Sequence, residues 1–257
     1  MSHPFTPRVG AVMSADIAVP EHDREVAFYA RALTTGAEPL WREDLMNRQG
    51  VPVIGLGARS PEYDQLPLQW MPHLQVTDVA GSAARAVELG GTELLHGKDD
   101  EGSSQWAVLL DPNGAAFGVI PVVSPEQAPP MDGDATKVGH IAWLDLTVPD
   151  AAATRDFYCQ VIGWTSQGVE MTDAQGAYHD YVLLGGDGEA AAGICHARGT
   201  NRDVPPVWLL YLPVGDLDES TRRVQEDGGA VLRRMDGPPA IAICTDPIGV
   251  VFALSQG

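Results

Sequence analysis

The chain has 257 residues, 44% of them hydrophobic, and a mean hydropathy of −0.07, which is typical of a globular protein and excludes a largely disordered one. Its 16 Lys and Arg residues against 35 Asp and Glu residues give a net charge of −19. This charge repels nucleic-acid phosphates and anionic membrane surfaces, so neither is an expected partner.

The first predicted elements are a strand and a helix. A β-branched apolar run over residues 17–19 stops at a proline, and residues 21–33 follow with the apolar spacing of a helix. The same pair returns later in the chain, as a strand over 146–148 and a helix over 151–162. In both places the helix carries Phe-Tyr at the same distance from the strand. The start of the chain is therefore repeated in its second half.

Weaker strands and a second helix come next in each copy. The strands are expected over residues 52–56, 181–184 and 191–196. The second helix is expected over 79–89 in the first copy and over 217–226 in the second. Each of these helices ends at Gly-Gly, which suits a left-handed cap at the C-terminus of a helix.

An Asp-Pro-x-Gly turn and a closing strand end each copy, at Asp111 and at Asp246. Three blocks in the same order over nearly the whole chain indicate an internal duplication. We predict a first module over residues 8–121, a linker over 122–137 that is rich in Pro, Asp and Gly, and a second module over 138–257.

Cysteine use and hydropathy indicate the cellular location. Cys159, Cys195 and Cys244 show no Cys-x-x-Cys spacing, so neither a disulfide framework nor a thiolate zinc site is expected. No run approaches the ~20 apolar residues of a membrane span, and the start of the chain has no signal-peptide pattern. A cytoplasmic protein is the expectation.

The order of these blocks resembles the vicinal oxygen chelate superfamily, which includes glyoxalase I, extradiol dioxygenases, fosfomycin-resistance enzymes and bleomycin-binding proteins. The resemblance covers the Phe-Tyr helix, the Val-x-Asp strand exit before the Gly-Gly helix end, and the closing Asp-Pro-x-Gly strand, all present twice. It implies an α+β fold of two tandem modules, each of paired βαβββ units whose curved mixed sheets surround a cavity.

The two copies differ at the end of the first helix. The second copy has the usual Ile162-Gly163-Trp164, whereas the first has Leu33-Thr34-Thr35. The second copy also resembles an actinobacterial group of duplicated proteins with a Trp early on the first strand and an acidic residue two positions later, here Trp143 and Asp145.

The resemblance locates the family's metal-binding positions, and this chain has no ligands there. The first-strand position falls on Ser14 and Trp143, the His position near Met71 and Leu209, and the Glu position on Gly118 and Ala253. An indole only donates hydrogen bonds, and a neutral hydroxyl is a poor donor to a divalent ion. We predict no metal and no other cofactor. A displaced site would have to draw on His73, His140, His179 and Glu170.

Two equivalent carboxylates are the candidate catalytic residues. Asp16 and Asp145 lie two residues beyond Ser14 and Trp143, so they share their face of the strand and are expected to point into the cavities. A carboxylate in an apolar cup can act as a general base or orient a ligand. The alternative is structural, with each Asp capping backbone N–H groups or pairing with an Arg.

Aromatic and neighbouring side chains would form the ligand-binding wall. Trp143 is selected by its family position, and Trp106 because it precedes the strand that ends at Asp111. Gln105 could add an amide contact. The predicted ligand-binding residues are Trp143, Ser14, Trp106, Gln105, Met71, His73, Leu209 and Tyr211.

Three functions follow from this pattern. The first is metal-independent binding or sequestration of a planar or hydrophobic secondary metabolite, as in the antibiotic-binding branch of the family. The second is a metal-free lyase, isomerase or cyclase with Asp145 or Asp16 as general base. The third is a metal-dependent lyase or dioxygenase with rearranged ligands. The fold hosts many chemistries and does not choose among them. A small molecule is the expected partner of a monomer or homodimer.

Overall fold

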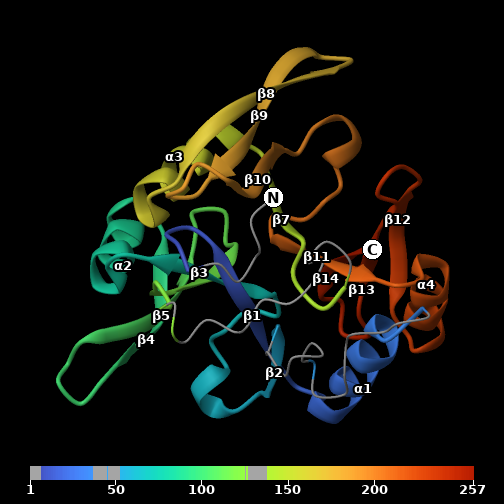
Figure 1. Ribbon diagram of the computed structural model, residues 1–257, viewed down its shortest axis with the longest axis horizontal. Helices are drawn as coiled ribbons and strands as arrows, with labels where there is room; N and C mark the ends of the chain where they lie inside the picture. Colours follow the sequence, from blue (N-terminus) through green and yellow to red (C-terminus); the bar gives the residue numbers. More distant parts are fainter. Residues whose placement is uncertain (1–6, 37–44, 46–52, 125, 127–137) are drawn as a thin grey trace. The chain divides into compact units, whose positions relative to one another are not determined.

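The computed structural model describes residues 7–36, 45, 53–124, 126 and 138–257 (Figure 1). Strands β1–β6 form a six-stranded sheet and strands β7–β14 an eight-stranded sheet. With the four α-helices found in the described residues, this is the predicted α+β architecture. In the described part of the chain, no helix is long and apolar enough to cross a membrane.

The helices lie where the apolar spacing predicted them. They are α1 (His22–Leu33), α2 (Val79–Glu88), α3 (Ala151–Ile162) and α4 (Leu217–Glu226). The strands are β1 (Val12–Val19), β2 (Ile54–Ala58), β3 (Met71–Val76), β4 (Thr92–Lys98), β5 (Ser104–Leu110), β6 (Ala116–Pro121), β7 (Trp143–Val148), β8 (Thr165–Asp173), β9 (Gly176–Leu184), β10 (Ala190–His196), β11 (Trp208–Val214), β12 (Ala230–Met235), β13 (Ile241–Thr245) and β14 (Val251–Gln256).

The ends of the helices follow local sequence. Asp150 caps α3 through its carboxylate, which accepts the N–H of Ala153 at 3.0 Å, and Asp78 and Asp216 do the same for α2 and α4. Gly90 and Gly228 both have φ +92, as the Gly-Gly ends predicted. The two first helices end differently, because α3 is followed by left-handed Gly163 whereas Thr34 after α1 keeps φ −93.

The chain folds into two compact units that do not coincide with the two halves of the sequence. Unit 1 comprises residues 1–13, 71–128 and 144–208, and unit 2 comprises 14–70, 129–143 and 209–257. Each unit thus combines one half of each predicted module. The limits 8–121 and 138–257 remain predictions, and residues 125 and 127–137 of the predicted linker lie outside the described part.

Unit 1 contains two half-sheets, each covered by one helix. Strands β3, β6, β5 and β4 pair in that order with α2 against them, and strands β7, β10, β9 and β8 pair in that order with α3 against them (Figure 1). The helices also contact each other. Phe117 of β6 packs edge to face on Phe157 and Tyr158 of α3, with ring centroids 6.2 and 5.2 Å apart. The helix-covered faces therefore form one core.

Unit 2 repeats this plan with the other halves. Strands β1 and β2 are parallel and lie against α1, and strands β11, β14, β13 and β12 pair in that order against α4. Helices α1 and α4 contact each other. Phe28 of α1 packs on Phe252 of β14 with ring centroids 6.1 Å apart. An ion pair between Arg31 and Glu226 at 2.7 Å joins the two helices at the surface.

A buried Tyr links each first helix to the closing turn of the other sequence copy. In unit 1 the hydroxyl of Tyr158 accepts from Trp208 Nε1 at 2.9 Å and donates to Asp111 at 3.4 Å. Asp111 follows the first module's β5, whereas Tyr158 and Trp208 belong to the second module. The two copies are therefore interlocked through buried hydrogen bonds.

Unit 2 contains the reciprocal link. Tyr29 accepts from Trp70 Nε1 at 3.1 Å and donates to Asp246 at 3.0 Å. Here the Tyr and Trp come from the first module and the Asp from the second. Because all three side chains are at most 2% exposed, these hydrogen bonds replace lost hydration. The Tyr of the Phe-Tyr block in one copy thus bonds to the Asp of the Asp-Pro block in the other copy.

Candidate functional site

The candidate site lies on the strand faces that the helices leave uncovered. In the first half-sheet of unit 1, Leu109 pairs with Phe117 on the helix-covered face. The opposite face is called open face A and consists of Met71, His73, Leu95, Trp106, Val108 and Gly118, which the strand register aligns. Three predicted ligand-binding residues, Met71, His73 and Trp106, are therefore on one face.

Two glycines shape open face A. A Cβ atom on Gly118 would lie 2.7 Å from Cδ2 of His73, so the imidazole lies across a strand position that has no side chain. A Cβ atom on Gly97 would lie 2.2 Å from Cε2 of Trp106, so the indole lies across β4 in the same way. Trp106 is nevertheless 42% exposed. Open face A thus offers a flat, accessible aromatic surface.

The prediction for Gln105 is corrected by the strand register. It neighbours Trp106 and so points to the opposite face of β5. Its Nε2 donates to Asp99 Oδ2 at 2.8 Å and to the Ser103 carbonyl at 3.3 Å. The amide holds the turn between β4 and β5 and is not available on open face A.

The second half-sheet of unit 1 presents acidic groups on its uncovered face, called open face B. Asp145 pairs with Gly193, and Cys195 pairs with Thr147, so these side chains share a face. Asp145 is half-buried. Burial, followed by the charges of Asp145 and Asp180, raises the pKa of Cys195. Cys195 is thus a neutral thiol beside a carboxylate, and it is not an activated nucleophile.

Asp180 and His196 lie at the end of open face B, and sequence reasoning missed them. The carboxylate of Asp180 accepts the backbone N–H of His196 at 2.8 Å and lies 3.3 Å from its Nδ1. Asp180 is 6% exposed. This contact orients the imidazole. Sequence offered no signal for it, because the two residues are brought together only by the register of β9 and β10.

In unit 2 the first strand carries Ser14 and Asp16. Asp16 pairs with Gly55, and a Cβ atom on Gly55 would lie 2.3 Å from Asp16 Oδ1. Asp16 is exposed, whereas the equivalent Asp145 is half-buried. Both Asp residues thus lie beside a glycine of the neighbouring strand. Trp143, which is half-buried, begins β7 two residues before Asp145.

The second half-sheet of unit 2 carries the remaining predicted residues. Tyr211 pairs with Ala253, and Ala253 pairs with Ile243, on the face away from α4. Arg233 pairs with Ile243 and so joins them. This face is called open face C and consists of Leu209, Tyr211, Arg233, Ile243 and Ala253. Sequence reasoning missed Arg233. The only available signal was the alignment of the two copies, which places Arg233 where the first copy has the apolar Leu95.

The donors that a divalent ion requires are not assembled. Met71 and Gly118 share open face A, and Leu209 and Ala253 share open face C, and none supplies an oxygen or nitrogen ligand. Glu170 and His179 face each other across β8 and β9. Within the described ranges no three His, Cys, Asp or Glu side chains converge on one point. The residues present do not fit the family's metal.

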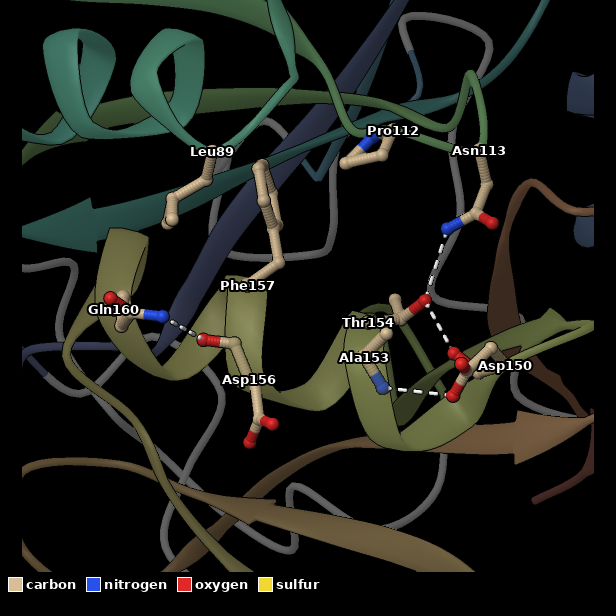
Figure 2. Close-up of a pocket in the computed structure, with 9 residues that line it drawn as sticks. All are labelled: Leu89, Pro112, Asn113, Asp150, Ala153, Thr154, Asp156, Phe157 and Gln160. Atoms are coloured by element: carbon tan, nitrogen blue, oxygen red, sulfur yellow. Dashed lines mark hydrogen bonds between the residues drawn. The ribbon is translucent and has the colours of Figure 1, made fainter.

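A separate pocket of about 450 Å³ lies on the helix-covered side of unit 1. Figure 2 shows its polar groups bonded to one another: Asn113 Nδ2 donates to Thr154 Oγ1 at 3.0 Å, and Thr154 donates to the Asp150 carbonyl at 2.9 Å. Phe157 and Leu89 supply its apolar wall. It contains none of the predicted site residues, and its polar groups stabilise α3.

In the comparison with known proteins, one family model matches each copy of the sequence repeat. The family model described as a glyoxalase-like domain matches residues 13–120. The model described as the glyoxalase/bleomycin resistance protein/dioxygenase superfamily matches residues 137–254. Together they cover both copies of the repeat.

One curated relative is the anthracycline biosynthesis protein DnrV of Streptomyces peucetius. It is 34% identical over 131 residues, which are 45% of this chain and 46% of that protein. The anthracycline biosynthesis protein DauV of a Streptomyces species matches to the same extent. The similarity thus spans about half the length of these relatives.

Solved structures share the fold over nearly the whole chain. A Mn(II)-bound glyoxalase from Novosphingobium aromaticivorans has a TM-score of 0.58 at 17% identity, covering 97% of this chain and 82% of that one. A 2,2',3-trihydroxybiphenyl 1,2-dioxygenase from Sphingomonas wittichii has a TM-score of 0.53 at 15% identity, covering 98% and 90%. The chain therefore belongs to the glyoxalase/bleomycin resistance protein/dioxygenase superfamily, the vicinal oxygen chelate proteins, with two tandem glyoxalase-type domains.

Proposed function

We propose that this protein binds a planar, largely apolar secondary metabolite on its open strand faces and does so without a metal ion. The observation that carries the proposal is Trp106, whose indole lies flat against Gly97 and is still 42% exposed. A large exposed aromatic ring at a position where the neighbouring strand has no side chain is suited to stacking on a planar molecule.

The relatives support the class of ligand. DnrV and DauV are named for anthracycline biosynthesis, and anthracyclines contain a planar fused-ring quinone. A quinone of this kind buries most of its surface by stacking and needs few polar contacts. The apolar residues at the family's metal positions, Met71, Gly118, Leu209 and Ala253, support binding through packing instead of chelation.

The first test measures by calorimetry the binding of an anthraquinone carboxamide, which is a neutral fused-ring probe. We expect the wild-type protein to bind it and Trp106→Ala to bind it about tenfold more weakly, because an exposed aromatic anchor contributes a large share of binding free energy. Val87→Ala is the matched control, since Val87 is 50% exposed on α2. Equal affinity of all three proteins would contradict a role for Trp106.

Metal independence is tested separately by metal analysis of protein purified without chelator. We expect less than stoichiometric Mn, Fe, Ni or Zn, and we expect affinity for the probe to be unchanged after dialysis against a chelator. A stoichiometric ion whose removal abolishes binding would overturn this part of the proposal and return attention to His73, His140 and His179.

A second function is favoured by one observation, the half-buried Asp145 beside the neutral Cys195. A carboxylate held in partly apolar surroundings can accept a proton from a ligand, as a lyase, isomerase or cyclase requires. Asp145→Asn should then abolish turnover and leave binding of the same molecule nearly intact. If Asp145→Asn weakens binding and turnover equally, Asp145 only binds. Asp16→Asn is the equivalent test in the first copy.

A further inference from the structure

One guanidinium nitrogen of Arg233, on open face C, is buried and has no hydrogen-bond partner among the described residues. Its Nη1 atom is inaccessible to solvent and receives no hydrogen-bond acceptor. Across the ranges that the structure describes, no hydrogen bond or ion pair includes this residue. The chain as a whole has 35 acidic residues, so carboxylates are abundant. Arg233 as a whole is half-buried, and its inaccessible Nη1 donor is unfavourable unless an acceptor reaches it.

A β-bulge places Arg233 on this face. Val231 pairs with Cys244, whose side chain is on the helix-covered side, and the next paired residue is Arg233 with Ile243. Leu232 is the extra residue and is 56% exposed. Without the extra residue, strict alternation would turn Arg233 toward α4. Bulges commonly redirect a side chain toward a site in this way.

The neighbouring Arg234 shows what an ordinary arginine does on this strand. It donates to Asp218 at 2.6 Å and to Asp236 at 3.1 Å. The first copy shows a second contrast, because its β4 has the same bulge and presents Leu95, opposite Val108, at the corresponding position. The bulge is therefore common to both copies, and the cation is specific to open face C.

The surroundings of Arg233 suit an organic anion. Tyr211, Ile243 and Ala253 follow one another across the sheet from β11 to β13, with Arg233 beyond Ile243 on β12. Ile243 and Ala253 are 5% and 0% exposed, so a ligand on this face would contact mainly the half-buried side chains of Tyr211 and Arg233. Guanidinium groups bind carboxylates through two parallel hydrogen bonds, which fix orientation as well as affinity, and the single oxygen of an ionised phenol accepts charge-assisted hydrogen bonds from the same donors.

We propose that Arg233 binds an anionic oxygen of the small-molecule ligand, a carboxylate or an ionised phenol, on open face C. This inference rests on the proposed function and adds the ligand's charge to it. The protein would then be selective for acidic planar metabolites over neutral ones of the same shape, in spite of its own net charge of −19.

The test compares an anthraquinone carboxylate with the carboxamide of the same ring position, and benzoate with benzamide, by calorimetry on the full-length protein. The variants are Arg233→Met and, as a control with the same change in charge, Arg234→Met. We expect the wild type and Arg234→Met to prefer each carboxylate by about tenfold or more, since a hydrogen bond between two charged groups is stronger than one to a neutral amide. Arg233→Met should lose this preference and bind the carboxamide as well as the wild type does.

Each outcome separates the two proposals. If both anthraquinones bind equally well to the wild type, or if the preference survives in Arg233→Met, the assignment of Arg233 is overturned and the proposed function stands. If neither anthraquinone binds, the proposed function fails for fused-ring ligands, and benzoate decides on Arg233: benzoate binding lost in Arg233→Met supports the anion site, and no such binding overturns it. A structural role for Arg233 predicts instead that Arg233→Met lowers the urea midpoint, whereas we expect no loss.

Discussion

Glu25→Gln should make the protein more stable above pH 7 by about 2–3 kcal/mol, with little effect below pH 4.5. Glu25 of α1 is fully buried, and neither of its oxygen atoms receives a hydrogen bond. Burial and, second, the charge of Asp246 raise its pKa from 4.5 to about 7. The folded protein therefore holds a proton that the unfolded chain releases, and stability falls as pH rises from 4.5 through 7.

The equivalent position in unit 1 shows why Glu25 and Asp246 lack a stabilising hydrogen bond to each other. In unit 1 the position of Glu25 is occupied by Thr154, whose hydroxyl accepts from Asn113 Nδ2 at 3.0 Å. The position of Asn113 is occupied in unit 2 by Ile248, which offers no side-chain donor. A glutamine at position 25 would supply an N–H group to the Asp246 carboxylate at every pH, which is why stabilisation is expected.

Urea unfolding at several pH values measures the effect, with Glu62→Gln as the control for an exposed glutamate. The difference in free energy of unfolding between Glu25→Gln and wild type should grow as pH rises, and the Glu62→Gln curve should run parallel to the wild type. If the free energy of unfolding of the wild type does not fall between pH 4.5 and 7, the raised pKa of Glu25 beside Asp246 is contradicted.

Asp111→Ala should destabilise the protein by about 3–5 kcal/mol, much more than the same change at Asp99. Asp111 Oδ1 accepts the N–H groups of Asn113 at 2.8 Å and Ala115 at 2.9 Å. Asp111 is 3% exposed, and its other oxygen accepts from Tyr158. Burial raises its pKa, and the hydrogen bonds from Ala115 and Asn113 oppose that shift. Alanine would leave these donors buried without an acceptor.

Asp99 is a closely matched control. Its Oδ1 accepts the N–H groups two and four residues later, at 3.0 and 2.8 Å, as Asp111 does, but in the exposed turn between β4 and β5. Water can replace those hydrogen bonds, so Asp99→Ala should cost about 1 kcal/mol. Asp111→Asn, which keeps one acceptor oxygen, should recover part of the loss if Asp111→Ala fails to fold. Equal losses for Asp99→Ala and Asp111→Ala would contradict the importance of burial.

Much of the fold was predictable because its signals are local. Apolar spacing of 3.6 residues indicates a helix wherever one face is buried, and residues 151–162 were predicted with the observed bounds. Gly-Gly ends predict left-handed caps because glycine alone adopts positive φ without strain, as Gly90 and Gly228 do. The duplication and the family followed from the order of such signals.

The candidate site was predictable only in part, because a strand's faces follow from alternation but its neighbours do not. His73 and Trp106 share open face A as alternation allows, while Gln105 was excluded by a turn contact with Asp99. Arg233 illustrates the limit: an unbroken alternation would place it against α4, and only the bulge at Leu232 shows that it faces the other way.

The sequence by itself determined the repeat and the order of elements, since both depend on residue types at fixed spacings, and it predicts that the family's metal ligands are missing. The tertiary structure decided which half of one copy packs with which half of the other. Tyr158 donates a hydrogen bond to Asp111, 47 residues away in sequence, and Tyr29 donates one to Asp246, 217 residues away. It also decided which charges are paired. Burial and pairing are properties of residues distant in sequence, and no local pattern encodes them.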